Sequence, residues 1–389
     1  MPRHRPAAFL ALLFLTLFAS AEEKITEKEL RAHVEVLADP ELAGRAPGTD
    51  GSRKAAEYIV GEMDSYGLEP AGEGETPYQT ILATGGAERG RNLCFLLPAT
   101  GDSQGVVVLG AHYDHLGAGP EGVFTGADDN ASGVAALLEI AELFASSRED
   151  RPRDVLFLAF DCEEQGMLGS TYWVAHPTVP LDRVEAMVCL DMLGRSVMDR
   201  FPGCVFAFGT EWSEDMGHEL KETPRPKGVE VWNIGTEFVG PRSDFLAFGL
   251  KRIPYVFFTT GTHEDYHTPG DVAEEVDVDS MAKLARFIAT FTERVASAED
   301  APRFHWMRPN GLREAEVVHG LVSRLTEDPP PGTPDWQLGI ASWLKRRSAR
   351  MIERGRVGVL DRATLIATTQ ALTLTLLQRN RSGPTEERK

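Results

Sequence analysis

The 389-residue chain has few cysteines, no excess of basic residues and, after residue 20, no long apolar run. Its 40 Lys and Arg residues against 59 Asp and Glu residues give a formal net charge of −19. A surface with that balance repels polyanions, which argues against nucleic acid or an anionic membrane as a partner. The lack of a long apolar run argues against a transmembrane helix in the body of the chain.

The cysteine pattern excludes some kinds of site. The four residues Cys94, Cys162, Cys189 and Cys204 lack the close spacing of a zinc ribbon or a redox pair. The first three lie in or beside apolar runs, which favours small, buried side chains. In an exported protein a pair could also form a disulfide, and the pattern does not choose which pair.

The first residues have the features of a secretory signal peptide. Arg3 and Arg5 precede an apolar run over residues 7–18, and the small residues 19–21 fit a cleavage site. Because the run is short for a membrane span, an uncleaved anchor is the less favoured interpretation. We predict a signal peptide over 1–21, a mature chain from near Glu22, and a periplasmic or extracellular location.

Apolar strands alternate with helices through the middle of the chain. Apolar runs typical of strands lie at 106–109, 155–160, 186–190 and 253–259, and helical spacing lies at 26–37, 51–66, 131–144 and 280–295. This alternation predicts an α/β fold with a mostly parallel, buried sheet. We assign it to one catalytic domain over residues 22–300.

The composition changes at residue 301. Residues 301–389 hold 15 Lys and Arg against 9 Asp and Glu, a local charge of +6. Prolines at 329–331 interrupt the segment, and residues 336–352 and 360–377 have the pattern of helices. We predict a helical C-terminal extension that packs on the acidic domain or mediates association.

Potential metal ligands follow the predicted strands. Because ligands of open α/β sheets bind beyond the carboxyl ends of the strands, we expect these side chains to meet. In chain order the candidates are His112 and Asp114, Asp128 and Asp129, Glu163 and Glu164, Asp191, and His267.

The donor types favour a pair of zinc ions. His112 and His267 offer imidazole nitrogen, carboxylates offer oxygen, and no thiolate takes part, so zinc is favoured, with cobalt or manganese as substitutes. If Asp129 bridges, each ion receives one histidine, the shared carboxylate and one carboxylate of its own, from Asp191 or Glu164. A hydroxide between the ions would balance the remaining charge.

Two further acidic residues have predicted roles beside the ions. Glu163 is not needed as a ligand, so it is the candidate general base that activates the water. Asp114 could accept the second ring N–H of His112 and fix its tautomer. We interpret His115, Asp128 and Glu139 as lying outside the metal shell.

At these residues the chain resembles the dizinc aminopeptidase family that includes secreted bacterial leucyl aminopeptidases, glutaminyl cyclases and glutamate carboxypeptidase II. The resemblance spans about Leu37 to Val295 and rests on motifs in the family's order: GRAPGT, HYDHLG, GADDNASG, EEQGMLGS, LDMLG, RSDFLAFG and YHTPGD. It implies a three-layer α/β/α sandwich with a mostly parallel central sheet. The C-terminal extension lies outside it.

The resemblance also implies roles for individual residues. His112 and Asp191 correspond to ligands of one zinc, Glu164 and His267 to ligands of the other, and Asp129 to the bridge. Glu163 corresponds to the general base and Asp114 to the partner of His112. The peptide bond after the bridging residue is often cis in the family, which implies a cis Asp129–Asn130 bond.

The chain departs from the family pattern in two places. Phe245 follows Asp244 where the family often has histidine, so the contact made by Asp244 is open. Some relatives steady the oxyanion with a tyrosine upstream of that motif. No tyrosine lies between Trp173 and Asp244, so that role is unassigned.

These observations predict a secreted metallo-aminopeptidase with two Zn²⁺ per chain, acting on peptides with a free N-terminus. The alternatives are a glutaminyl cyclase-like zinc acyltransferase and a catalytically silent binding protein on the peptidase fold. A carboxypeptidase for acidic substrates would need arginines near the site, for which Arg195 and Arg242 are the candidates. Substrate preference and oligomeric state stay open.

Overall fold

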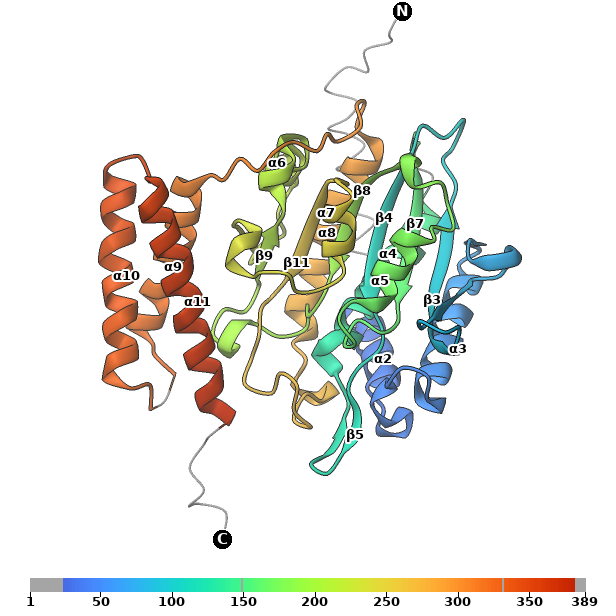
Figure 1. Ribbon diagram of the computed structural model, residues 1–389, viewed down its shortest axis with the longest axis horizontal. Helices are drawn as coiled ribbons and strands as arrows, with labels where there is room; N and C mark the ends of the chain where they lie inside the picture. The colour runs from blue at the N-terminus through green and yellow to red at the C-terminus, as the bar shows by residue number, and fades with distance from the viewer. Residues whose placement is uncertain (1–23, 148–149, 331, 382–389) are drawn as a thin grey trace, which may run out of the picture.

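The computed structural model describes residues 24–147, 150–330 and 332–381; the predicted signal peptide lies outside them. Its centre is a mixed sheet (Figure 1). The four middle strands run parallel in the order β7 (Asp154–Phe160), β4 (Val106–His112), β8 (Val184–Leu190) and β11 (Tyr255–Thr259). The predicted α/β fold is confirmed, and its central strands are those expected from the sequence.

Antiparallel pairs flank this parallel centre. On one side β3 (Glu88–Leu97) runs antiparallel to β7 and pairs with β1 (Glu69–Pro70) and β2 (Tyr78–Leu82). On the other, β9 (Cys204–Phe208) runs antiparallel to β11 and parallel to the edge strand β10 (Glu230–Asn233). A small hairpin, β5 (Gly117–Gly119) and β6 (Gly122–Phe124), stands apart from the sheet.

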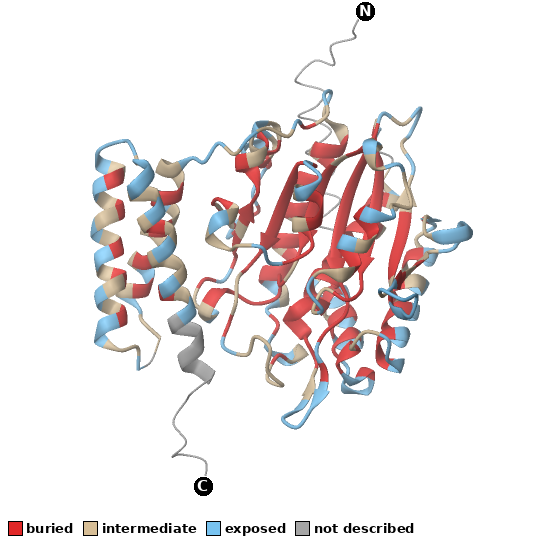
Figure 2. Cartoon of the chain, viewed as in Figure 1, coloured by how far each residue is buried: buried red, intermediate tan, exposed pale blue. Residues whose placement is uncertain are grey.

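Helices cover both faces, because successive side chains of each strand point to opposite sides. Val107 and Leu109 of β4 belong to one core, and Val106 and Val108 to the other. Figure 2 shows the buried residues concentrated along the strands. The first core is closed by α2 (Glu27–Leu37), α3 (Asp50–Ser65), α4 (Gly133–Ser146), α6 (Glu214–Glu222) and α8 (Val278–Ser297), the second by α5 (Leu168–Ala175) and α7 (Phe245–Leu250). This is the expected three-layer sandwich.

Three C-terminal helices stand at one side of the sheet (Figure 1). They are α9 (Gly311–Glu327), α10 (Asp335–Glu353) and α11 (Val359–Arg381). Their buried apolar residues join the second core, and α9 lies beside β10. The helices therefore cover a sheet edge that would otherwise expose unpaired backbone groups. Within the described ranges, no helix has the length and apolar character needed to cross a membrane.

A buried ion pair ties the C-terminal helices together. Arg362 of α11 donates two hydrogen bonds, of 2.6 and 2.9 Å, to the Glu314 carboxylate on α9, and it also pairs with Glu237. Glu314 is 1% exposed. Removing the arginine would leave a buried carboxylate without its cation, which is far more costly than losing a surface pair.

We predict that Arg362→Met lowers the free energy of unfolding by about 3 kcal/mol. The matched control is Arg354→Met, because Arg354 is half-exposed and pairs with Asp361 at 3.0 Å. That variant should lose less than about 1 kcal/mol. Denaturant unfolding of both variants checks this, and equal losses would contradict the argument from burial.

Candidate metal centre

The predicted ligands meet at the carboxyl ends of the parallel strands. His112 is the last residue of β4, Asp191 directly follows β8, and Glu164 lies four residues beyond β7. Asp129 lies in the helical turn that leads into α4, and His267 in the loop after β11. The topology therefore gathers side chains that are 155 residues apart in sequence, from His112 to His267.

The Asp129 carboxylate faces two histidines, one with each oxygen. Its Oδ1 lies 3.4 Å from His112 Nε2, and its Oδ2 lies 3.1 Å from His267 Nε2. Asp191 Oδ1 is also 3.4 Å from His112 Nε2, and Glu164 Oε1 is 3.3 Å from His267 Nε2. Two donor groups thus share one carboxylate.

His115 extends the second group. Its Nδ1 lies 2.9 Å from Glu164 Oε1 and 3.8 Å from Asp129 Oδ2. The sequence interpretation set His115 apart from the metal shell, whereas the structure places its ring against the proposed ligand Glu164. The available signal was the HYDH spacing, which puts a second imidazole in the same loop as His112.

The donor set fits zinc. Two ligands at the Zn–N and Zn–O lengths of tetrahedral zinc lie about 3.3 Å apart, and the measured separations scatter around that value. The groups His112, Asp129, Asp191 and His115, Asp129, Glu164 could each hold a metal ion. Among the described residues, the buried atoms Glu164 Oε1 and Asp191 Oδ1 have no hydrogen-bond partner, which a bound cation would supply.

Asp114 contacts the backbone of the loop that carries Glu163 and Glu164. Its carboxylate accepts hydrogen bonds from the main-chain N–H groups of Glu163 at 3.0 Å and Glu164 at 3.2 Å. Its Oδ1 lies 3.7 Å from His112 Nδ1, which also lies 3.3 Å from the Asp114 carbonyl oxygen. The Asp114 carboxylate therefore positions the backbone of both glutamates, and its predicted role in orienting His112 stays a prediction.

Glu163 lies in an environment that favours its neutral form. Burial, with the charges of Asp244 and Asp191 adding to it, raises its pKa well above the ordinary value, while His112 opposes the shift. Asp244 is itself buried, with neither carboxylate oxygen hydrogen-bonded within the described chain, and burial raises its pKa to about 7. A carboxyl group with a raised pKa can hold a proton near neutral pH.

The histidines and Glu164 affect each other's ionisation. Although burial lowers it, contact with Asp129 and Glu164 raises the pKa of His267 to about 10. Although burial opposes it, His115 and His267 hold the pKa of Glu164 below its usual value. The site thus stabilises the Glu164 carboxylate in its charged form beside the two histidines.

Sequence reasoning missed the residues that hold Asp129 in place. Asp271 accepts hydrogen bonds from the N–H groups of Asp128 at 2.8 Å and Asp129 at 3.0 Å. The Asn130 side chain donates to the Leu190 carbonyl at 3.0 Å and accepts from the Met192 N–H at 3.1 Å. It therefore hydrogen-bonds to the backbone on both sides of Asp191. The Asp129–Asn130 peptide bond is cis, as the resemblance implied.

The residues interpreted as outside the shell have structural partners of their own. Asp128 accepts from Gly194 N–H at 2.6 Å and lies 3.3 Å from His263 Nε2. Glu139 lies 3.0 Å from His33 Nε2, in the helical layer.

Three loops of the site contain a residue in the left-handed backbone conformation: Cys162, Met192 and His267, with φ of 60°, 57° and 57°. Such conformations persist where surrounding contacts enforce them.

Arg45, from the GRAPGT motif, is a buried cation behind the loops. It is 1% exposed and donates to the carbonyl oxygens of Tyr113 at 2.8 Å, Thr125 at 2.6 Å, Gly126 at 2.9 Å and Leu37 at 2.5 Å. Burial lowers its pKa to about 10, against the opposing charges of Asp271 and Asp129. It joins the loop of His112 to the loop of Asp129.

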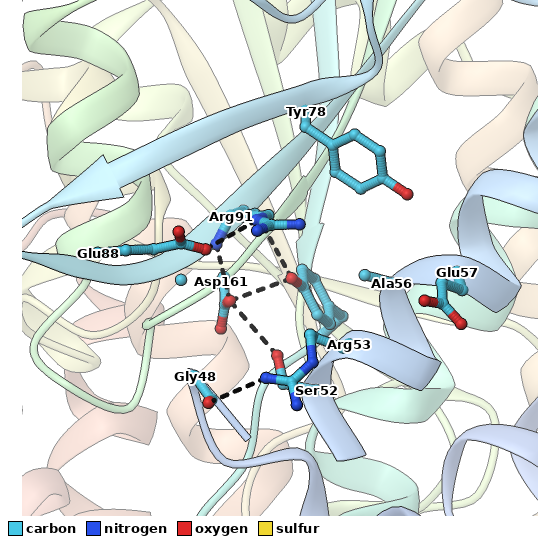
Figure 3. A pocket seen from close by; sticks show the side chains of 11 residues that line it. Gly48, Ser52, Arg53, Ala56, Glu57, Tyr78, Glu88, Arg91 and Asp161 are labelled. Carbon is cyan, nitrogen blue, oxygen red and sulfur yellow. Dashed lines mark hydrogen bonds and ion pairs between the residues drawn. The ribbon is translucent and has the colours of Figure 1, made fainter. Parts of the chain in front are cut away.

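A cavity of about 320 Å³ lies beside this framework (Figure 3). Ser52, Arg53, Tyr78, Arg91, Tyr113 and Asp161 line it, and none of the predicted ligands does. Asp161 accepts from Arg91 N–H at 2.9 Å and from the Tyr113 hydroxyl at 3.1 Å. The Tyr113 hydroxyl thus contacts Asp161 and, through the Arg91 carbonyl, strand β3. These contacts fix Tyr113, which lies between His112 and Asp114 in the sequence.

The chain belongs to peptidase family M28, whose model matches residues 92–292. It is 27% identical to aminopeptidase YwaD of Bacillus subtilis over 206 residues, which are 51% of this chain and 43% of that protein. It is 30% identical to leupeptin-inactivating enzyme 1 of Streptomyces exfoliatus over 151 residues, 39% of this chain and 31% of that one. The chain therefore spans less than half the length of these relatives.

Two solved structures have the same fold as this chain. The LapA aminopeptidase of Legionella pneumophila has a TM-score of 0.59 at 22% identity, covering 73% of this chain and 75% of LapA. A glutaminyl cyclase of Porphyromonas gingivalis has a TM-score of 0.54 at 19% identity, covering 68% of this chain and 97% of the cyclase. At these identities the likeness establishes the fold and does not separate the two chemistries.

We predict that Arg45→Met lowers the free energy of unfolding by at least about 3 kcal/mol, because four buried carbonyl groups lose a donor. Arg53→Met is the matched control, since Arg53 is exposed and its partners are exposed as well: the Gly48 carbonyl, at 3.4 Å, and the Asp50 carboxylate. Chemical denaturation of both variants checks this. An Arg45→Met protein as stable as the control would contradict the proposed joining of the loops.

Proposed function

We propose that this protein is an exported, zinc-dependent aminopeptidase that hydrolyses the N-terminal residue of peptides. The observation that carries the proposal is the Asp129 carboxylate, which presents one oxygen to His112 and the other to His267. Asp191 and Glu164 then complete two similar donor groups, with His112, Asp129 and Asp191 as ligands of one ion and Asp129, Glu164 and His267 as ligands of the other. Aminopeptidases among the family's members support the same assignment.

In this proposal the chain's own residues handle the proton. Two zinc ions bound here would polarise the scissile carbonyl and lower the pKa of the attacking water. Glu163 takes the proton of that water and passes it to the nitrogen of the leaving amine. Asp114 accepts hydrogen bonds from the main-chain N–H groups of Glu163 and Glu164, so one carboxylate positions both the proposed base and the proposed ligand.

A carboxypeptidase for acidic substrates is less well supported. Such an enzyme needs a free guanidinium near the ions to bind a substrate carboxylate. Arg195 already donates to both Asp199 oxygens, at 2.9 and 2.8 Å, and to Asp265 at 2.8 Å. These two carboxylates neutralise the Arg195 guanidinium, so a carboxypeptidase site would have to rely on the other candidate, the exposed Arg242.

The second candidate is a glutaminyl cyclase-like acyltransferase, favoured by the shared fold. Two complete donor groups support the hydrolase instead, since such cyclases usually work with a single zinc. A silent binding protein is disfavoured because Glu163 and every predicted ligand are present.

We further propose the extents of the parts. The peptidase domain spans residues 22–300, a range that contains the match to the family model. Residues 301–389 form a helical extension, and residues 1–21 direct export before they are removed. The composition of the first residues supports this last assignment.

Replacing the proposed base tests the mechanism. We expect Glu163→Gln to retain its zinc and to lose at least about 100-fold in kcat on aminoacyl chromogenic substrates, because a neutral amide accepts no proton. Glu69→Gln, at an exposed position on β1, is the control and should keep full activity. A Glu163→Gln enzyme with near wild-type kcat would remove Glu163 from the mechanism.

Metal content tests the pairing of ions. We expect about two zinc ions per chain by elemental analysis, loss of hydrolysis after treatment with a zinc chelator, and recovery when zinc is added back. Panels of aminoacyl and N-terminal glutaminyl substrates should separate the candidates. One zinc per chain with cyclisation of glutamine and no hydrolysis would favour the cyclase.

A further inference from the structure

We propose that His115 is an additional protein ligand of the ion assigned to Asp129, Glu164 and His267. The inference rests on the proposed zinc site and adds a fourth donor to one half of it. His115 is completely buried and lies in the HYDH segment, three residues after His112.

Two imidazole nitrogens face the same pair of carboxylate oxygens in this half of the site. His115 Nδ1 lies 2.9 Å from Glu164 Oε1 and 3.8 Å from Asp129 Oδ2. His267 Nε2 lies 3.3 and 3.1 Å from the same two oxygens. These separations bracket the edge of about 3.3 Å expected for donors around tetrahedral zinc.

The 2.9 Å approach of His115 Nδ1 to Glu164 Oε1 lacks the angular geometry of a hydrogen bond. Neither of its ring nitrogens has a hydrogen-bond partner within the described ranges, and Glu164 Oε1 has none either. A buried imidazole without a partner is rare in folded proteins. A cation between the nitrogen and the oxygen satisfies both lone pairs at once.

The surrounding chain makes room for the ring. A Cβ atom at Gly126 would lie 2.6 Å from His115 Cγ and Cδ2, so only glycine fits there, and its φ of +59° also favours glycine. The His115 and His267 rings meet edge to face, with centroids 5.8 Å apart at 69°. Packing therefore fixes the imidazole toward Glu164 and Asp129.

A fourth protein ligand makes the two ions unequal. Four protein donors are typical of closed, structural zinc sites, whereas three with an open position are typical of catalytic ones. The ion of His112, Asp129 and Asp191 would keep the more open position, while both ions could still polarise the substrate carbonyl. The ion held by His115 is the tightly bound one.

X-ray absorption at the zinc edge of the full chain tests the assignment, because imidazole scattering counts histidine ligands. Three histidines shared by two ions give an average of about 1.5 imidazoles per zinc, and two give about 1.0. We expect about 1.5 for the wild-type protein and for His176→Ala, an exposed control, and about 1.0 for His115→Ala. A wild-type value of about 1.0 overturns the proposal.

Zinc transfer to a competing chelator gives a second readout. We expect His115→Ala to weaken the tighter ion at least 10-fold and to leave the other ion unchanged. His115→Asn separates ligation from hydrogen bonding, because its amide can still donate to Glu164. Wild-type affinity in that variant overturns the ligand assignment.

The two proposals can fail separately. A wild-type protein with two zinc ions, hydrolysis and about 1.0 imidazole per ion keeps the aminopeptidase and removes His115 from the shell. A protein with two zinc ions, about 1.5 imidazoles per ion and no hydrolysis keeps the His115 ligand and removes the aminopeptidase.

Discussion

Asp129 must present its two carboxylate oxygens to two different histidines, and much of the surrounding structure serves that requirement. Asp271 accepts hydrogen bonds from the Asp128 and Asp129 N–H groups, which fixes the turn before α4. Asn130 then links that turn to the backbone on both sides of Asp191. These hydrogen bonds fix the backbone that carries Asp129 and Asp191. The fixed backbone limits where their carboxylates can lie, which preorganises the proposed ligand shell.

The same arrangement concentrates negative charge in a buried space. Asp114, Asp128, Asp244 and Asp271 are buried around the ligands, and burial raises the pKa of Asp244 to about 7 and of Asp271 to about 6. Burying carboxylates is costly unless hydrogen bonds or cations offset it. Main-chain N–H groups and Arg45 provide part of that offset, and divalent ions at the donor groups would provide the rest.

The sequence predicted the strands and helices whose apolar pattern is strong, including β4, β7, β8 and α8. It missed β3, whose first half is charged, and the short strands β9 and β10, which lie among glycines and prolines. It also missed α9, in which charged residues alternate with the buried apolar ones. The family resemblance is confirmed by the match to peptidase family M28. The ligand candidates follow from their positions after strands, but the placement of His115, the backbone contacts of Asp114 and the role of Arg45 depend on how separate loops pack, which no local pattern encodes.

The central claim is that one carboxylate joins two metal ions, and anomalous X-ray diffraction from crystals of the zinc-loaded protein tests it most directly. The account predicts two anomalous peaks about 3.5 Å apart, one on each side of the Asp129 carboxylate, beside His112 and beside His267. A single peak, or two peaks of which neither contacts Asp129, would contradict it.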